Sequence, residues 1–517
     1  MNEVLARIFP LRSRLAEELP DVCPANFPED LVQHSQCCKN HPYLPDLAAL
    51  EKEYYRLATA RVSFPANVHR RIINPTVKIL EVGWKGLPEY ILDQAVQPQV
   101  GNSLVLLFRP TPQSSVQMTT PTGHDLLALK LVTEGMSSLQ AAADAMVTLG
   151  QIDTILAAAV QKGLILSPPS RLVRDKSFFL DSFSEPEQQT VATFTLQWHL
   201  TQACDLNCRH CYDRSNRKNM ELSQAIHVLD ELYAFSEANH VQSQVSFSGG
   251  NPMLYPFFYE LYRQAVDRGF LVAVLGNPME EQHIERLLAI RRPEFYQVSL
   301  EGLSGHNDYI RGKGHFQRVL DFLQLLRKYR IYSMVMLTLT RANRHEVLSL
   351  AEELRGKVDT FTFNRLAMVG EGAELASFEV EAFPQFLEEF LAASGLNKSL
   401  SLKDNFFNLL LNGHGQPLTG GCTGFGCGAA FNFVSVLPDG EVHACRKFPS
   451  LLGNIFTQSL NDIYTGKQAE RYRTGSTACL DCKLRPVCRG CPAVAYGFGL
   501  DVFSARDPYC FGPVIEK

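Results

Sequence analysis

Three cysteines that lie close together in the sequence are the residues best suited to chemistry. Cys204, Cys208 and Cys211, here called the cysteine triad, stand in the run CDLNCRHCY at the end of a strand-like segment. Three thiolates are one fewer than a closed tetrahedral site uses, and thiolates at this density suit an iron–sulfur cluster or zinc. A cluster held by three thiolates leaves one iron open to a small molecule. We therefore expect a reactive metal centre here, with a zinc knuckle or free thiols as the alternatives.

The triad and its flanking residues resemble those of the radical S-adenosylmethionine (SAM) enzymes. The resemblance implies that the triad holds a 4Fe-4S cluster and that its open iron binds the amino and carboxylate groups of SAM. It also implies that an electron cleaves SAM to a 5′-deoxyadenosyl radical, which abstracts hydrogen from a substrate carbon. The protein then has to orient the cofactor and exclude water, because the radical chemistry belongs to the cofactor.

Segments that follow other predicted strands resemble the SAM-binding segments of this family. SGGNP (248–252) resembles a motif that usually reads GGEP, and SLEG (299–302) with HNDYIRG (306–312) resembles a segment of the peptide-modifying branch, with Glu301 in place of aspartate. The resemblance implies that Asn251 accepts a hydrogen bond from the SAM amino group, that Ser299 binds its ribose or carboxylate, and that Arg311 holds its carboxylate. The cofactor-binding candidates are Tyr212, Gly249, Gly250, Asn251, Pro252, Asn277, Ser299, Arg311 and Asn364.

Simpler interpretations exist for several of these residues. The two glycines could form a plain turn, Arg311 could be a solvated residue at a helix start, and Tyr212, which would otherwise shield the cluster or pack near the adenine, could simply pack in the core. For the glycines, position beside the cysteine triad favours the cofactor-binding interpretation.

A second group of cysteines follows residue 420. Its spacing, C-x12-G-x4-C from Cys427 and then C-x2-C-x5-C from Cys479, resembles the SPASM extension of radical SAM enzymes; the run CRGC has two residues between its cysteines where that extension usually has three. Eight thiolates fill two 4Fe-4S clusters. The resemblance implies a first auxiliary set of Cys422, Cys427, Cys445 and Cys491, and a second auxiliary set of Cys479, Cys482, Cys488 and Cys510. Zinc ribbons are the alternative.

Cys23, Cys37 and Cys38 remain outside these sets. A metal site that combines the last two with His34 and His41 is conceivable, but unliganded thiols are favoured.

The elements that must position these residues alternate between strand and helix from Thr193 onward. Predicted strands at 193–200, 243–248, 270–275, 295–300, 332–340 and 359–364 are separated by predicted helices at 222–238, 256–268, 280–290, 315–329 and 345–355. This alternation predicts an α/β fold with a parallel sheet, a partial (β/α)6 TIM barrel of the radical SAM type. Catalytic groups of such barrels lie at the carboxyl ends of the strands, where the cysteine triad falls.

The regions outside the barrel complete the predicted domain organisation. Residues 1–100 are expected to be helical, with an apolar stripe through Leu47, Leu50, Tyr54 and Leu57. Residues 101–166 resemble a winged-helix precursor-recognition domain that opens with a hairpin of Leu104–Phe108 and Val116–Thr119. The remaining boundaries are a linker at 167–190, the barrel at 191–375, bridging helices at 376–420 and the SPASM domain at 421–517.

Composition gives the class of protein but not its reaction. The chain has 517 residues, 45% hydrophobic and 20% charged, as in a soluble protein of several domains. Its net charge of −5 gives no electrostatic case for binding nucleic acid or an anionic membrane. No apolar segment reaches membrane-spanning length and no export signal is visible. Because most of the 14 cysteines are clustered as metal ligands would be, we expect a cytoplasmic protein.

Together these features predict a radical SAM maturase that modifies a ribosomally made precursor peptide at or near a cysteine. Expected cofactors are three 4Fe-4S clusters and SAM, and expected partners are a precursor whose leader binds the N-terminal region and an electron donor such as flavodoxin or ferredoxin. The GGNP variant also resembles maturases of selenobiotic or thio(seleno)oxazole-type precursors. The alternatives are a formylglycine-forming enzyme similar to the anaerobic sulfatase maturases, and a non-catalytic peptide-binding scaffold stabilised by zinc.

Overall fold

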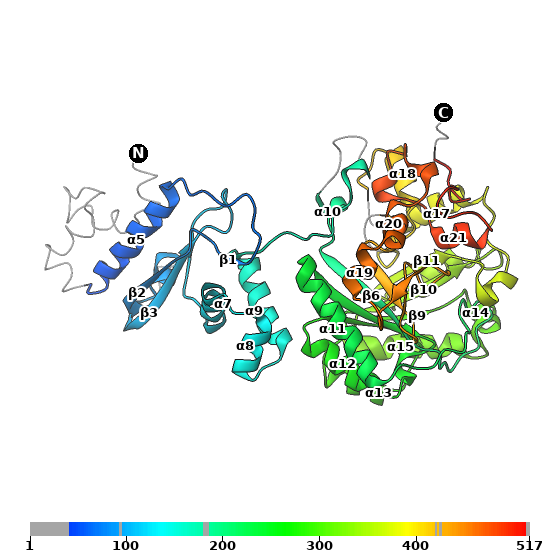
Figure 1. Cartoon of the computed structure of the whole chain (residues 1–517), viewed down its shortest axis with the longest axis horizontal. Helices are drawn as coiled ribbons and strands as arrows, with labels where there is room; N and C mark the ends of the chain where they lie inside the picture. Colours follow the sequence, from blue (N-terminus) through cyan, green and yellow to red (C-terminus); the bar gives the residue numbers. More distant parts are fainter. Residues whose placement is uncertain (1–40, 93–95, 179–185, 419–420, 423–425, 513–517) are drawn as a thin grey trace. The chain divides into compact units, whose positions relative to one another are not determined.

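The computed structural model describes residues 41–92, 96–178, 186–418, 421–422 and 426–512. The chain divides into two compact units, unit 1 (Met1–Pro169) and unit 2 (Ser170–Lys517) (Figure 1). Cys23, Cys37, Cys38 and His34 lie outside the described residues, so their predicted state stays a prediction.

In unit 1, the strands of a small antiparallel sheet are preceded and followed along the sequence by helices. Its elements are α5 (Leu44–Thr59), β1 (Ile72–Ile73), β2 (Lys78–Lys85), α6 (Leu87–Leu92), β3 (Gln99–Phe108), β4 (Gln117–Thr119), α7 (Gly123–Glu134), α8 (Ser138–Ala145), α9 (Leu149–Lys162) and β5 (Ile165–Leu166). Strands β2, β3 and β4 form one sheet in that order, and β1 pairs with β5.

The predictions for unit 1 are partly confirmed. The hairpin is present as β3 and β4, which pair antiparallel, and the stripe of α5 is buried at Leu47, Leu50 and Leu57. The expectation that residues 1–100 are helical is wrong for 72–85, which form β1 and β2. The cause is visible in β2, where the apolar residues alternate through Leu80, Val82 and Trp84 with the two-residue period of a strand. A winged-helix identity for 101–166 stays a prediction.

Glycines end two of the helices in unit 1. Helix α7 ends at Gly135, which has φ +65°, and α8 begins after Ser137, whose hydroxyl accepts a hydrogen bond from the Gln140 N–H. A left-handed residue at a helix end favours glycine because glycine lacks a Cβ. The same pattern recurs at Gly163, which ends α9.

Unit 2 begins with a strand–helix alternation that follows the prediction closely. Its first elements are α10 (Pro186–Gln189), β6 (Thr193–Thr201), α11 (Leu222–Asn239), β7 (Gln242–Gly249), α12 (Phe258–Asp267), β8 (Leu271–Leu275), α13 (Glu281–Leu288), β9 (Tyr296–Ser299), α14 (Ser304–Arg311), α15 (His315–Lys328), β10 (Ser333–Leu339), α16 (Val347–Glu353) and β11 (Thr360–Arg365). The predicted open (β/α)6 arrangement is confirmed, and α14 is a helix that the sequence did not predict.

The C-terminal part of unit 2 continues the same sheet. Its elements are α17 (Phe383–Leu396), α18 (Phe407–Gly413), β12 (Phe433–Val436), β13 (Glu441–His443), β14 (Leu451–Asn454), α19 (Leu460–Thr465), α20 (Lys467–Thr474) and α21 (Pro492–Gly497). The sheet has the order β11-β10-β9-β8-β7-β6-β12-β13-β14. Strand β12 pairs parallel with β6, so the C-terminal domain extends the barrel sheet beyond its first strand.

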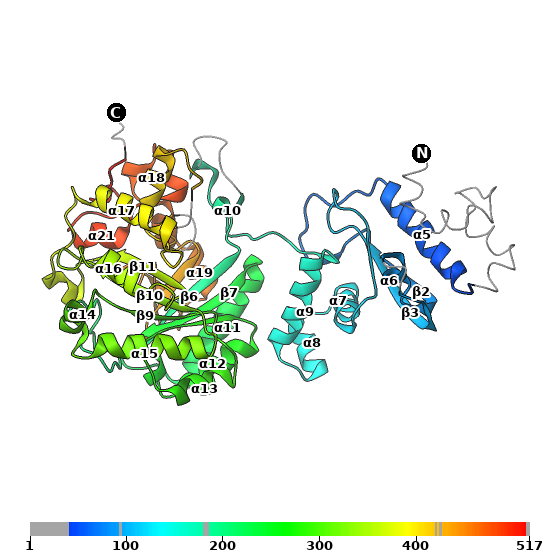
Figure 2. The same ribbon diagram turned by 180° about the vertical axis from the view of Figure 1, so that it is seen from behind.

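The core of unit 2 is apolar and continuous between the barrel and the C-terminal domain. Trp198, Phe247 and Tyr296 on the strands are completely buried, and the helices that connect the strands cover them. Figure 2 shows α11, α12 and α15 lying along the strands from the other side. Burial of this many large side chains holds the strand ends, and therefore the loops that follow them, in fixed positions.

The predicted linker at 167–190 is wrong for its middle part. Leu172, Arg174 and Phe178 are buried within unit 2, and the Arg171 N–H donates to the Asn239 carbonyl. The Phe178 ring lies 3.9 Å from the Arg485 guanidinium. These apolar and cation–π contacts attach residues 170–178 to unit 2.

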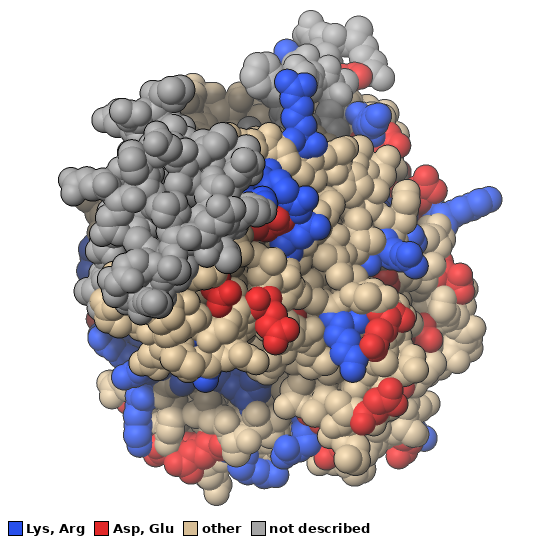
Figure 3. All heavy atoms as spheres, turned by 90° about the vertical axis from the view of Figure 1, so that its left-hand side faces the viewer, with Lys and Arg blue, Asp and Glu red and all other residues tan. Residues whose placement is uncertain are grey.

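Charged side chains of both signs are interspersed on the face of the protein shown in Figure 3, in the part that the structure describes. No helix in the described ranges combines the length and apolar composition needed to cross a bilayer.

Candidate radical SAM active site

The cysteine triad lies in the loop after β6, at the carboxyl end of that strand. Two backbone hydrogen bonds attach this loop to the end of β7: Gly250 N–H donates to Thr201 C=O (2.8 Å), and Asn251 N–H donates to Ala203 C=O (2.7 Å). A Cβ on Gly250 would lie 2.4 Å from the Ala203 carbonyl oxygen. Glycine is therefore required at position 250 for the two loops to approach this closely.

Further hydrogen bonds hold the triad loop from two other sides. Arg209 N–H donates to Ile310 C=O on α14 (3.0 Å), and Glu371 N–H donates to Cys211 C=O (2.9 Å). Cys204 is exposed, whereas Cys208 and Cys211 are half-buried. Burial raises the pKa of the Cys204 and Cys208 thiols, so they favour the neutral form until a metal binds.

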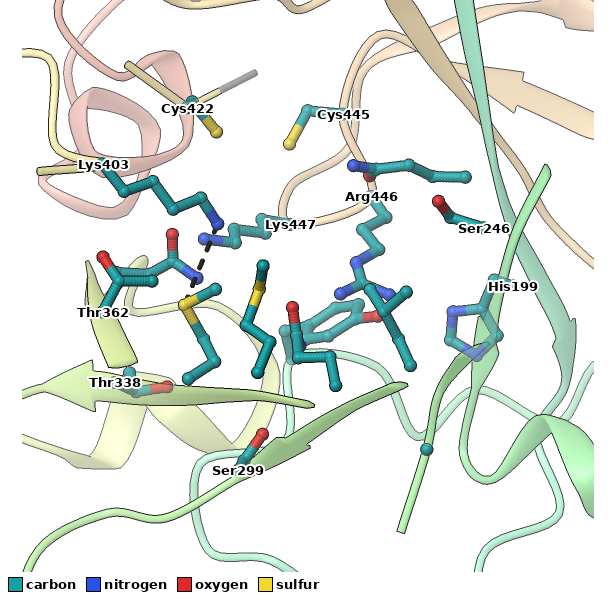
Figure 4. Close-up of a pocket in the computed structure, with 18 of the residues that line it drawn as sticks. His199, Ser246, Ser299, Thr338, Thr362, Lys403, Cys422, Cys445, Arg446 and Lys447 are labelled. Carbon is teal, nitrogen blue, oxygen red and sulfur yellow. Dashed lines mark hydrogen bonds between the residues drawn. The ribbon is translucent and has the colours of Figure 1, made fainter. Parts of the chain in front are cut away.

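The triad opens into a large cavity of about 1320 Å³ (Figure 4). All three triad cysteines line it, as do the strands of the barrel and, from the C-terminal domain, Cys422 and Cys445. One cavity therefore joins the predicted SAM cluster to part of the first auxiliary set.

Most of the predicted SAM-binding residues lie on this cavity. Those that line it are Tyr212, Gly249, Gly250, Asn277, Ser299, Arg311 and Asn364. Asn251 and Pro252 are buried and do not line it. The structure thus brings together residues from the ends of five different strands, and direct contact of each with SAM stays a prediction.

Asn251 has a bracing role in this structure. Its side-chain oxygen accepts from the Met253 N–H (3.4 Å), and its amide nitrogen donates to Asp205 Oδ1 (3.0 Å). Asn277 also donates to Asp205 Oδ1 (2.7 Å) and lies 3.6 Å from Cys204 Sγ. Two asparagines thus hold an aspartate beside the first cysteine, a residue that the sequence did not single out. The predicted hydrogen bond from Asn251 to the SAM amino group is not tested here.

Arg311 is held by a buried carboxylate. Its Nε and Nη2 donate to Glu301 Oε1 (2.9 and 2.6 Å), and Glu301 Oε2 accepts from the Thr338 N–H (2.8 Å). Burial favours the neutral acid, but the charges of His210 and Arg311 hold the pKa of Glu301 well below its usual range. Arg311 Nη1 lies 3.7 Å from Cys208 Sγ, so this pair also positions the triad loop. A bond from Arg311 to the SAM carboxylate stays a prediction.

Several C-terminal cysteines are neighbours of one another in the structure. Burial raises the pKa of Cys427 to about 11 and that of Cys491 to about 12. Cys422 and Cys445 are neighbours of Cys427, and Cys427 is a neighbour of Cys491. In the predicted second set, burial raises the pKa of Cys479, next to Cys510 and Cys482, and of Cys488, next to Cys510. The division of these cysteines into two auxiliary sets, and their binding of clusters, stay predictions.

The short CRGC loop uses unusual backbone conformations. Arg489 and Gly490 both have positive φ, +64° and +59°. Cys491 N–H donates to Asp507 Oδ2 (2.7 Å), and Arg489 Nη1 donates to Cys427 C=O (2.8 Å). A tight left-handed turn therefore connects Cys488 and Cys491 across the two intervening residues, and their assignment to different sets stays a prediction.

The thiol donors suit iron–sulfur clusters. Within the described ranges, no three or more His, Cys, Asp or Glu side chains converge closely enough to hold a single metal ion. In a four-iron cluster each thiolate binds a different iron, so wider spacing is expected. The described cysteines are all free of disulfides. The donors are thus of the kind that 4Fe-4S clusters use, and the choice between such clusters and zinc ribbons stays a prediction.

Sequence reasoning missed several residues of the cavity, above all Lys403, Arg446, Lys447 and His199. Arg446 and Lys447 follow Cys445 directly, so their adjacency to a predicted ligand was a usable signal. Lys403 lies in a loop before α18, and no pattern in the sequence marks it as a residue of the cavity. His199 lies on β6, is 2% exposed, and burial lowers its pKa to about 4, so it is neutral near pH 7.

Comparison with known proteins agrees with this geometry. The model of the radical SAM superfamily matches residues 198–354, and that of the SPASM iron–sulfur cluster-binding domain matches residues 427–492. The first covers the cysteine triad and five barrel strands, and the second covers six C-terminal cysteines. The chain therefore contains a radical SAM domain followed by a SPASM domain. These two domains imply 4Fe-4S clusters and SAM as cofactors.

Two curated relatives each match about three fifths of this chain. An AdoMet-dependent heme synthase of Methanosarcina barkeri is 28% identical over 352 residues, which cover 62% of this chain and 97% of the relative. The mycofactocin maturase MftC of Mycolicibacterium smegmatis is also 28% identical over 352 residues, 63% of this chain and 86% of the relative. In fold, the enzyme is similar to SuiB of Streptococcus suis bound to its precursor peptide SuiA, with a TM-score of 0.51, 15% identity, and coverage of 79% and 96%.

Proposed function

We propose that this radical SAM enzyme is a maturase that modifies a ribosomally synthesised precursor peptide. The observation that carries the proposal is the cavity of about 1320 Å³ that joins the cysteine triad to Cys422 and Cys445. Sites for single small molecules are commonly about 300–1,000 Å³, so this cavity has room for SAM together with a segment of a substrate. The peptide-maturing relative MftC supports a peptide as that substrate.

The residues of the cavity suit separate tasks. A reduced cluster on the triad, when bound, supplies the electron that cleaves SAM. Gly249 and Gly250 let the backbone approach the cofactor, and Ser299, Asn277 and Asn364 offer hydrogen bonds along the strand ends. The pair of Glu301 and Arg311 fixes the loop that carries Cys208. The barrel and the C-terminal domain enclose the space and restrict water.

The same proposal includes the number of clusters, the unit that binds the leader, the electron donor, the compartment and the domain boundaries. The enzyme uses three 4Fe-4S clusters, one on the triad and one on each auxiliary set. Unit 1, with the winged-helix-like region at 101–166, binds the leader of the precursor. An external flavodoxin or ferredoxin supplies electrons, and the enzyme acts in the cytoplasm. The barrel occupies 191–375, the bridging helices 376–420 and the SPASM domain 421–517.

Anaerobic reconstitution tests the cluster assignment. The wild-type enzyme should bind about twelve irons and form 5′-deoxyadenosine from SAM after reduction. Replacement of all three triad cysteines by alanine should leave about eight irons and abolish 5′-deoxyadenosine. A control with Cys479→Ala and Cys482→Ala should lose about four irons but still cleave SAM. SAM cleavage by the triad variant would refute the assignment.

The peptide substrate is tested separately. A short peptide encoded beside the gene of the enzyme should change in mass when the two are co-expressed under anaerobic conditions. The same peptide co-expressed with the triad variant serves as the control and should keep its mass. A wild-type enzyme that cleaves SAM but modifies only a sulfatase would instead support the formylglycine-forming alternative.

A further inference from the structure

Three basic side chains gather on the wall of the cavity that faces the C-terminal domain. Lys403 comes from the loop before α18, and Arg446 and Lys447 follow Cys445. We call these three residues the basic wall. Figure 4 shows the amino groups of Lys403 and Lys447 close together above the ends of the barrel strands, with Arg446 beside them.

The basic wall lacks carboxylate partners among the described residues. The hydrogen bond of Lys403 Nζ goes to the Met336 thioether sulfur (3.8 Å), a weak acceptor. Arg446 Nη1 donates to Ser248 Oγ (2.6 Å), and its guanidinium lies 5.7 Å from the centre of the Tyr212 ring. Neither lysine nor this arginine forms an ion pair with the aspartates and glutamates that the structure places.

Two other arginines on the same cavity form close ion pairs with carboxylates, unlike the residues of the basic wall. Arg311 lies 2.6 Å from Glu301, and Arg365 lies 2.8 Å from both Asp404 and Asp507. The fold therefore supplies carboxylates where an arginine has a structural role. The basic wall has none, so its charges remain available to a ligand.

The three charges also repel one another. Lys447 and Arg446 are like-charged neighbours of Lys403. A group of like charges in a half-buried site is unfavourable unless an anion compensates it. The chain as a whole has a net charge of −5, so this local excess of positive charge is opposite to the average of the molecule.

The directions of the side chains separate two roles for these charges. Cations near cysteines could simply offset the negative charge of an auxiliary cluster. However, Arg446 reaches across to Ser248 on β7, and Lys403 reaches to Met336 on β10, so both point to the space above the barrel strands. Lys447 lies with them in Figure 4. This is the space between the two cysteine groups that a substrate would occupy.

We propose that the basic wall binds a carboxylate of the substrate, either an acidic side chain or a free C-terminal carboxylate. The proposal rests on the proposed function, because it assigns the substrate to the cavity shared by the triad and Cys422. Two lysines and an arginine can each donate a charge-assisted hydrogen bond to carboxylate oxygens. The site would select peptides that carry a negative charge near the modified residue.

Chemical protection of the two lysines tests this proposal on the reconstituted enzyme with SAM present. Lysine acetylation is followed by mass spectrometry in the presence of three probes. N-acetylglutamate α-methylamide carries a side-chain carboxylate, N-acetylglutamine carries a C-terminal carboxylate, and N-acetylglutamine methylamide is neutral. At a probe concentration of about twice Kd, at least one acidic probe should slow acetylation of Lys403 and Lys447 about threefold. Exposed Lys313 should react at the same rate throughout.

The two acidic probes distinguish the source of the carboxylate. Slower acetylation with the first indicates an acidic side chain, and slower acetylation with the second indicates the C-terminus. Equal rates with the acidic and neutral probes would overturn the proposal. If the same preparation still forms 5′-deoxyadenosine, the proposed function survives that result; if it does not, the proposed function fails independently.

A variant separates the substrate role from the cluster role. Lys403→Gln should reduce the protection of Lys447 by the acidic probe, whereas the control Lys313→Gln should not. The midpoint potential of the first auxiliary cluster is measured on both variants. A shifted potential in Lys403→Gln with unchanged protection of Lys447 would show that the basic wall serves the cluster, and would overturn the proposal.

Discussion

Gly250 illustrates how a single residue controls the approach of two loops. Its N–H bonds to the end of β6, and its missing Cβ leaves space for the Ala203 carbonyl and for Cys204. A side chain would meet two backbone atoms of Ala203 and the Cβ of Cys204, and none of these can rotate away as the end of a flexible side chain could. The placement of the first triad cysteine therefore depends on this glycine.

Gly250→Ala should displace the Cys204 loop. Because a misplacement of about 1 Å can reduce a rate about hundredfold, we expect a loss of that size in 5′-deoxyadenosine formation. Iron content should be measured on the same sample. Gly305→Ala is the control, because a Cβ on Gly305 meets nothing within 4 Å; its rate should be unchanged. Full activity in Gly250→Ala would contradict the steric argument.

At the scale of elements, the turn between α14 and α15 depends on a buried histidine. His315 is 1% exposed at the first position of α15, and its Nδ1 lies 3.2 Å from the Asn307 side-chain nitrogen, from which it accepts. Burial lowers the pKa of His315 to about 4, helped by Arg311 and Arg318, while Glu301 and Asp308 act in the opposite direction. The folded protein thus holds this ring neutral.

The stability of the fold should therefore depend on pH through His315. The unfolded chain binds a proton near the usual pKa of about 6.5, but the folded state does so only near 4. The contribution of the neutral His315 ring to the free energy of unfolding is therefore complete above pH 6.5 and is lost as the pH falls toward 4. Between about pH 7.5 and pH 5, the wild type should lose about 2 kcal/mol more than His315→Gln. Urea unfolding at both pH values measures this; equal losses would disprove it.

At the scale of the whole of unit 2, one arginine connects the barrel to the C-terminal domain. Arg365 ends strand β11, is nearly fully buried, and pairs with Asp404 and Asp507 at 2.8 Å each. Asp507 also accepts from the Cys491 N–H, so a chain of hydrogen bonds runs from the barrel sheet to the first auxiliary set. Cys491 is thereby positioned by a residue of the other domain.

Arg365→Gln should leave two buried carboxylates without a cation. Breaking such a pair costs about 3–5 kcal/mol, and we expect a loss of that size in the free energy of unfolding together with lower iron content. Arg344→Gln is the control, because its ion pair with Glu379 is exposed, and should cost less than about 1 kcal/mol. Denaturant unfolding and iron analysis measure both. An effect of Arg365→Gln no larger than that of the control would argue against a structural link.

Features that depend only on residues close together in the chain were predictable from the sequence. The spacing of the triad marked the cluster loop, and the alternation of apolar residues marked the barrel strands, because a strand or a motif is local in the chain. The alternation in β2 was present as well but was overlooked.

The tertiary structure alone decided what distant segments do together. Three contacts join residues that are far apart in the sequence: the pairing of β12 with β6, the ion pair of Arg365 with Asp507, and the proximity of Lys403 to Lys447 in the cavity. Their proximity results from packing of the whole domain rather than from any local pattern. The position of the triad loop at the end of a barrel strand was therefore predictable, whereas the basic wall of the cavity was not.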